Sequence, residues 1–97
     1  MRPSEVLEKN RQAIREATKR FNAANPRVFG SVARGEDRPD SDLDILVDAL
    51  PGSTLLTLGG LQDALEQMMI GTSIHLLTPG DFPETIRTRV LSEAKPI

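Results

Sequence analysis

The chain has 97 residues, of which 12 are basic and 14 are acidic, so its net charge is −2. A chain of this length supports one small core, and residues 1–97 are expected to form a single domain. The absence of cysteine excludes a disulfide scaffold, a cysteine-ligated metal centre and a cysteine nucleophile, and makes a reducing cytoplasm the expected location. No apolar run approaches the roughly twenty residues that span a membrane, so we expect no membrane association. The slight negative charge and the lack of Trp and Tyr argue against direct binding of long nucleic acids.

Helical and extended patterns alternate along the chain. Ser4 is a candidate cap for the first helix, whose apolar residues recur every three to four positions, and Pro26 disfavours a helical residue before it. Gly59 and Gly60 weaken the start of a later helix, which leaves a start nearer Leu61 open. The predicted elements are helices at 5–21, 31–35, 55–69 and from 82 to about 93, and strands at 27–29, 43–47 and 73–78. This order predicts an α/β (α+β) fold in which helices flank a short mixed sheet of three strands.

Two aspartates stand in a segment that otherwise has the pattern of a buried strand. Asp42 and Asp44 are two residues apart, so both carboxylates project from one face, while the alternating apolar residues point to the core. Two carboxylates held this close repel each other unless a cation lies between them. Mg²⁺ prefers one or two carboxylates together with substrate phosphates and water. Asp42 and Asp44 are therefore predicted to bind Mg²⁺, with Mn²⁺ left open.

Gly30 and Ser31 follow a predicted strand at the point where a short helix begins. Free backbone N–H groups there, with the Ser31 hydroxyl, are suited to hold a phosphate, and a glycine permits close approach. Alone, each motif is most often a turn or a loop start. Together, a phosphate cradle and a carboxylate metal site are the equipment for phosphoryl or nucleotidyl transfer.

The motifs Gly30-Ser31, Ala33-Arg34-Gly35 and Ser41-Asp42-Leu43-Asp44 resemble the signature of the minimal nucleotidyltransferases, within the DNA polymerase β-like superfamily. The resemblance covers nearly the whole chain and implies the fold of that superfamily. It also implies that the chain is an antitoxin paired with a HEPN-domain toxin that cleaves RNA. In that family the nucleotidyltransferase can move AMP from ATP onto a tyrosine of the toxin and silence it.

The resemblance also implies roles for individual residues. Gly30 and Ser31 would hold the triphosphate of ATP, and Asp42 and Asp44 would bind Mg²⁺ and carry the catalysis. For Arg34, a place near the phosphates and an outward salt bridge remain equal alternatives.

One position departs from the family pattern, which usually has a third carboxylate on the next strand. Here that position is His75, within Ile74-His75-Leu76-Leu77-Thr78. Imidazole can serve as a base near neutral pH, but it is a poor ligand for Mg²⁺, which prefers oxygen. We expect a catalytic role for His75.

Two other functions stay open. In the first, the same fold neutralises the toxin by binding alone, and His75 marks weakened chemistry. In the second, the acceptor is an RNA end or a small-molecule hydroxyl.

Overall fold

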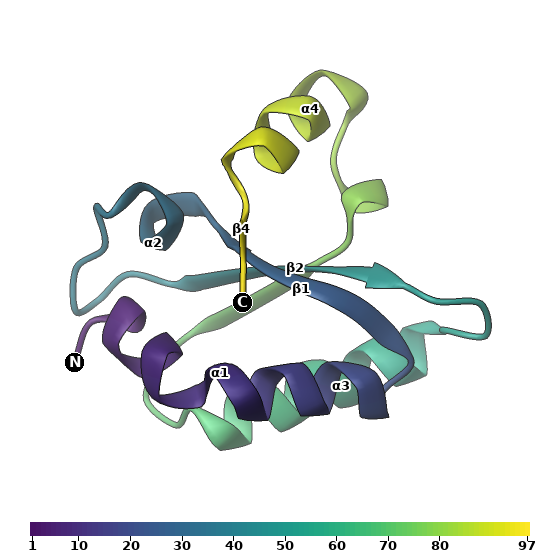
Figure 1. Cartoon of the computed structure of the whole chain (residues 1–97), viewed down its shortest axis with the longest axis horizontal. Coiled ribbons are helices and arrows are strands. Elements are labelled where there is room, and N and C mark those ends of the chain that lie inside the picture. Colours follow the sequence, from purple (N-terminus) through teal and green to yellow (C-terminus); the bar gives the residue numbers. More distant parts are fainter.

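The computed structural model describes residues 1–97, and its helices and strands alternate almost throughout (Figure 1). The elements in chain order are α1 (Pro3–Arg20), β1 (Ala23–Phe29), α2 (Gly30–Arg34), β2 (Leu43–Ala49), α3 (Leu55–Met68), β3 (Ile74–Leu77), a 3₁₀ turn η1 (Pro79–Asp81), α4 (Glu84–Glu93) and β4 (Lys95–Pro96). The predicted mixed α+β class is confirmed. No helix combines the length and the apolarity that a membrane crossing requires.

The sheet has four strands rather than the three that were predicted, in the order β3-β2-β1-β4. It is mixed, because β2 runs parallel to β3 whereas β1 runs antiparallel to both β2 and β4. The extra strand has only two residues, Lys95 and Pro96, which pair with Val28 and Arg27. Two residues are too few to show any alternation of apolar and polar side chains, so the sequence pattern does not reveal this strand.

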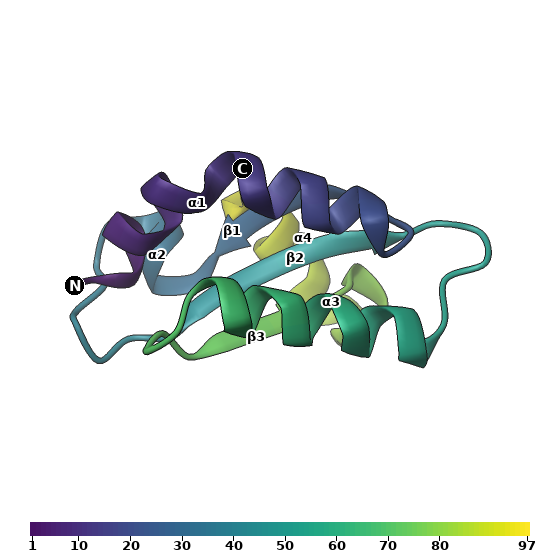
Figure 2. The ribbon, with the colours of Figure 1, turned by 90° about the horizontal axis from the view of Figure 1, so that it is seen from below.

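The helices α1 and α3 lie side by side across one face of the sheet, and α4 lies on the other side (Figures 1 and 2). Leu43, Ile45 and Val47 of β2 belong to the core beneath α1 and α3, as their alternation with polar residues predicts. On the opposite face, Leu46 is also fully buried. Nearby, the rings of Phe29 and Phe82 meet edge to face at 5.7 Å. Both faces of β2 therefore bear buried side chains.

Several boundaries differ from those predicted. The first helix begins at Pro3, not near Glu5, because proline suits the first turn of a helix. The N–H of Ser4 then donates to the carboxylate of Asp37 (2.9 Å), so Asp37 and not Ser4 caps this end.

The first strand begins at Ala23, not Arg27. A bulge between Ala24 and Arg27, with Asn25 at a φ of 55°, accommodates Pro26 within the strand. The third helix does begin at Leu55, where the Thr54 side chain accepts a hydrogen bond from the Thr57 N–H (3.2 Å).

Candidate active site

Asp44 lies where β1, β2 and the turn into α2 come together. In the antiparallel pairing of β1 with β2, Phe29 is opposite Asp44, which brings the next residue, Gly30, against the Asp44 side chain. Gly30 has a φ of 72°, and a Cβ atom built on it would lie 2.1 Å from Oδ2 of Asp44. No side chain fits there without displacing the carboxylate. The structure thus places two of the sequence motifs, twelve to fourteen residues apart along the chain, in direct contact.

His75 is brought to the same carboxylate from the other side. In the parallel pairing of β2 with β3, Asp44 is opposite His75. Nδ1 of His75 lies 3.3 Å from Oδ1 of Asp44, and Nε2 lies 3.6 Å from Oδ2 of Asp42. Each carboxylate therefore faces a different nitrogen of one imidazole. Asp42, Asp44 and His75 form a contiguous cluster, as the sequence predicts.

The surroundings of Asp44 disfavour its ionised form. Burial raises the pKa of Asp44 above its ordinary value, the neighbouring His75 opposes this rise, and the negative charge of Asp42 adds to it. The positive charge of Arg34 also lowers the pKa of Asp44, although by less than burial raises it. A half-buried carboxylate beside a second carboxylate is an arrangement that a cation stabilises.

The donor set suits one hard cation. Asp42 and Asp44 supply oxygen, which Mg²⁺ and Mn²⁺ prefer, whereas an imidazole is a weak addition to such a site. No group of three or more His, Cys, Asp or Glu side chains is arranged to hold a metal ion by itself. The two carboxylates would therefore hold Mg²⁺ only together with water and substrate oxygens, and that is how this ion is commonly bound.

The start of α2 offers backbone donors beside the carboxylates. Phe29, at the N-cap of this helix, contributes no side-chain hydrogen bond to the first N–H groups of Gly30–Arg34. These groups lack intrahelical partners, as at every helix start. With the Ser31 hydroxyl they are suited to hold an anion next to Asp44.

Arg34, at the end of α2, forms ion pairs with two carboxylates. Its Nε donates to Oε2 of Glu36 (3.1 Å), and its Nη1 donates to Oε1 of Glu93 in α4 (2.8 Å). Of the two alternatives that the sequence left open, the structure shows the salt bridge. Sequence reasoning missed Glu93, and nothing near it in the chain could have revealed the pairing.

Asp48, on the same strand, is a structural residue. Its carboxylate accepts hydrogen bonds from the buried Arg27 (3.1 Å) and from Asn25 (3.2 Å). The hydrogen bond from Arg27 lowers the pKa of Asp48. The Asp48 side chain therefore ties β2 to β1.

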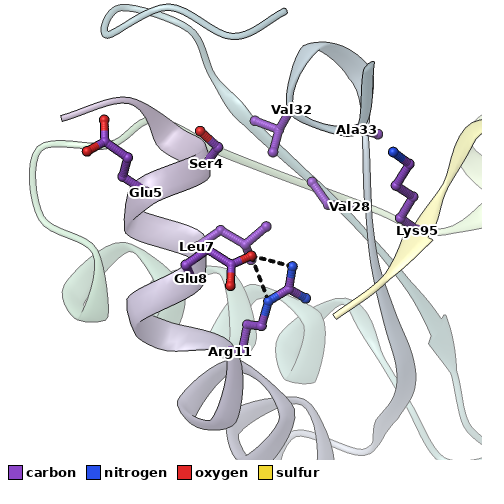
Figure 3. Close-up of a pocket in the computed structure, with 9 residues that line it drawn as sticks. All are labelled: Ser4, Glu5, Leu7, Glu8, Arg11, Val28, Val32, Ala33 and Lys95. Atoms are coloured by element: carbon purple, nitrogen blue, oxygen red, sulfur yellow. Dashed lines mark hydrogen bonds and ion pairs between the residues drawn. The ribbon is translucent and has the colours of Figure 1, made fainter. Parts of the chain in front are cut away.

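The largest pocket, of about 340 Å³, is not at this cluster (Figure 3). It lies between the first half of α1 and the residues Val28, Val32 and Ala33, and none of the predicted site residues lines it. Its charges are partly neutralised, because Glu8 and Arg11 pair with each other at 2.6 Å. The carboxylate cluster therefore lies outside the pockets of the isolated chain, on a more open surface.

A carboxylate pair held against a glycine turn suits enzymes that transfer phosphate-containing groups. The family model described as Polymerase beta, Nucleotidyltransferase matches residues 12–97, and the chain belongs to this family. It is 35% identical to the protein adenylyltransferase MntA of Thermococcus cleftensis, over 91% of this chain and 85% of that protein. The family membership that the sequence motifs indicated is therefore confirmed.

Two solved structures share the fold. One, provisionally described as a minimal nucleotidyltransferase, has a TM-score of 0.86 and 41% identity, with 97% of this chain and 95% of that chain covered. The other is a crystal structure of a toxin–antitoxin with AMP-PNP, with a TM-score of 0.72, 19% identity, and 90% and 71% coverage. At that identity the second structure supports the fold alone.

Proposed function

We propose that the chain is an antitoxin that transfers AMP from ATP onto a HEPN-domain toxin, with Mg²⁺ or Mn²⁺ as the cofactor. The observation that supports this proposal is the contact between Gly30 and Asp44, because a phosphate bound at Gly30 and Ser31 would then lie beside the carboxylates. The name of the Thermococcus relative, a protein adenylyltransferase, supports a protein as the acceptor. The toxin–antitoxin of similar fold makes a toxin a reasonable acceptor to test.

In the proposed reaction, a hydroxyl oxygen of the toxin forms a bond to the α-phosphorus of ATP. The bond from that phosphorus to the oxygen bridging to the β-phosphate breaks, and pyrophosphate leaves. The backbone N–H groups at Gly30 and Ser31, with the Ser31 hydroxyl, hold the triphosphate and orient it for this displacement. Asp42 and Asp44 would hold the metal ion, which when bound neutralises phosphate charge.

His75 is proposed to accept the proton of the attacking hydroxyl. Its ring lies against both carboxylates, at 3.3 Å from Asp44 and 3.6 Å from Asp42, so its orientation is set by groups of the site itself. Side-chain bases of this kind contribute about 10²- to 10⁴-fold to a rate. This role explains how transfer can proceed with an imidazole in place of a third carboxylate.

The test is the intact mass of the toxin after incubation with this chain, ATP and Mg²⁺. We expect a gain of at least one AMP unit, lost with Asp42→Asn and retained with Asp40→Asn. Asp40 is a matched control because it is an exposed aspartate two residues away, and its loss changes the charge equally. No mass gain with the natural chain, or an equal gain with Asp42→Asn, would count against the proposed chemistry.

Neutralisation by binding alone is the second candidate, favoured by His75 at the position where the family usually has a carboxylate. It predicts a stable complex and a protected cell without any mass gain, and equal protection by the Asp42→Asn chain. Protection that depends on Asp42 would exclude it.

A further inference from the structure

The helix α4 makes hydrogen bonds to the rest of the molecule near its start and at its end. None of its ten residues is buried. At its start, Arg87 donates hydrogen bonds to the carbonyl oxygens of Pro79 (2.8 Å) and Phe82 (2.9 Å). At its end, Glu93 accepts the hydrogen bond from Arg34. Because so short a helix is marginal by itself in water, these contacts contribute to holding it in place.

The contact at the end of α4 uses the one arginine of the short helix that begins the phosphate cradle. Arg34 is the last residue of α2, whose first residues are Gly30 and Ser31. Gly30 lies against the Asp44 carboxylate, and Arg34 is four residues further along the same helix, about 6 Å along its axis. Arg34 is thus close enough to the carboxylate cluster to affect a ligand bound there.

In the present arrangement Arg34 has little to offer an anion. Glu36 and Glu93 both pair with its guanidinium, at 3.1 Å and 2.8 Å. One positive and two negative charges give a group with a net charge of −1, which does not attract a triphosphate. Arg34 can contribute to triphosphate binding only after it has left at least one of these carboxylates.

We infer that Glu93 and the triphosphate of the nucleotide compete for Arg34, so that nucleotide binding releases the end of α4. The inference rests on the proposed function, because it takes Gly30 and Ser31 as the triphosphate cradle. Glu93 is more easily exchanged for phosphate than a buried partner, since Arg34 is 47% exposed and Glu93 is 24% exposed. Glu93 then acts as a residue that limits nucleotide affinity and ties the position of α4 to the state of the site.

The effect is reciprocal and modest. If the nucleotide weakens the Arg34–Glu93 pair, then loss of that pair must strengthen nucleotide binding by the same factor. Solvent-exposed ion pairs contribute little, and their usual strength converts to an affinity change of about two- to fivefold.

The experiment measures binding of AMP-PNP with Mg²⁺ to the full chain by titration calorimetry. We expect Glu93→Gln to bind about two- to fivefold more tightly than Glu84→Gln. Glu84 is the matched control, because it lies on the same helix, is exposed, and its loss changes the net charge equally. In an Arg34→Gln background, Glu93→Gln should change nothing.

Hydrogen exchange provides a second measurement, of how firmly the end of α4 is held. Adding AMP-PNP to the natural chain should increase deuterium uptake in residues 90–94, where the Ala94 N–H donates to the Val90 carbonyl oxygen (3.0 Å). The Glu93→Gln chain should show the higher uptake before any nucleotide is added.

Different results would refute the competition for Arg34 and the proposed nucleotide site. Equal affinity of the Glu93→Gln and Glu84→Gln chains overturns the competition, as does weaker binding by Glu93→Gln, which would mean that Glu93 positions Arg34 for the phosphates. Failure of the natural chain to bind AMP-PNP at all overturns the nucleotide site itself, and with it the inference.

Discussion

Two glycines with the same backbone conformation allow the contact at the site to be tested by itself. Gly30 and Gly35 both have a φ of 72°, so alanine at either position is forced into the left-handed region. That strain costs about 1–2 kcal/mol per residue in both variants. A Cβ at Gly35 meets nothing within 4 Å, whereas a Cβ at Gly30 would be 2.1 Å from Oδ2 and 3.1 Å from Cγ of Asp44.

The difference between the two variants therefore measures displacement of one carboxylate. Ordinary contact begins at 3.4 Å, so Oδ2 of Asp44 must retreat by 3.4 − 2.1 = 1.3 Å when Gly30 becomes alanine. A shift of about 1 Å in a group that positions reactants can reduce a rate on the order of 10²-fold. We expect Gly30→Ala to lower AMP transfer by about that factor relative to Gly35→Ala.

The assay is the rate of AMP incorporation into the toxin partner, measured beside unfolding by urea for both variants. Both chains carry the same backbone strain, so any lower free energy of unfolding of Gly30→Ala relative to Gly35→Ala reports the cost of displacing Asp44. Equal transfer rates for Gly30→Ala and Gly35→Ala would refute the reasoning, since the methyl group would then be accommodated without moving Asp44.

Two further predictions concern stability. Asp37→Asn should lower the free energy of unfolding at pH 7 by about 1 kcal/mol, because the carboxylate accepts the N–H of Ser4 at the start of α1. Burial acts to raise the pKa of Asp37, but hydrogen bonds from Ser4 outweigh it and the folded-state pKa is lowered. This stabilisation is therefore present above the ordinary pKa of about 3.9 and is lost as the pH falls through the lower folded-state value, so natural and variant chains should converge in acid, as followed by circular dichroism. Gly59→Ala should stabilise α3 by about 0.5–1 kcal/mol, whereas Gly60→Ala should destabilise the chain by about 1–3 kcal/mol, because its Cβ would lie 2.6 Å from Cε1 of Phe21. Equal urea midpoints for the two alanine variants would contradict this packing.

The carboxylate pair could be predicted from the sequence because its geometry is local. Asp42 and Asp44 alternate with residues of a strand, and a period of two puts both on one face whatever the strand pairs with. The same alternation correctly placed Leu43, Ile45 and Val47 in the core. No such rule gives the distance from Gly30 to Asp44, which depends on how β1 and β2 are aligned.

The missed parts of the fold depend on contacts between distant segments. The strand β4 forms because Lys95 and Pro96 pair with the edge of β1 that β2 leaves free. Next to this pairing, the N–H of Ile97 donates to the Pro26 carbonyl oxygen at 2.9 Å. Likewise, β1 continues through Pro26 only because a bulge takes up the extra length. Local rules treat a proline as an interruption, and the pairing strands override them.

Asp44 shows why the site is more than its motifs. It lies on β2, which pairs with β1 on one side and with β3 on the other. One register brings Gly30 to its carboxylate, and the other brings His75. A slip of two residues in either pairing would keep every apolar side chain facing the core, yet it would separate the cradle or the imidazole from Asp44. Hydrophobic alternation alone therefore cannot assemble this site, and the exact alignment must come from specific contacts such as the glycine that admits the Asp44 oxygen.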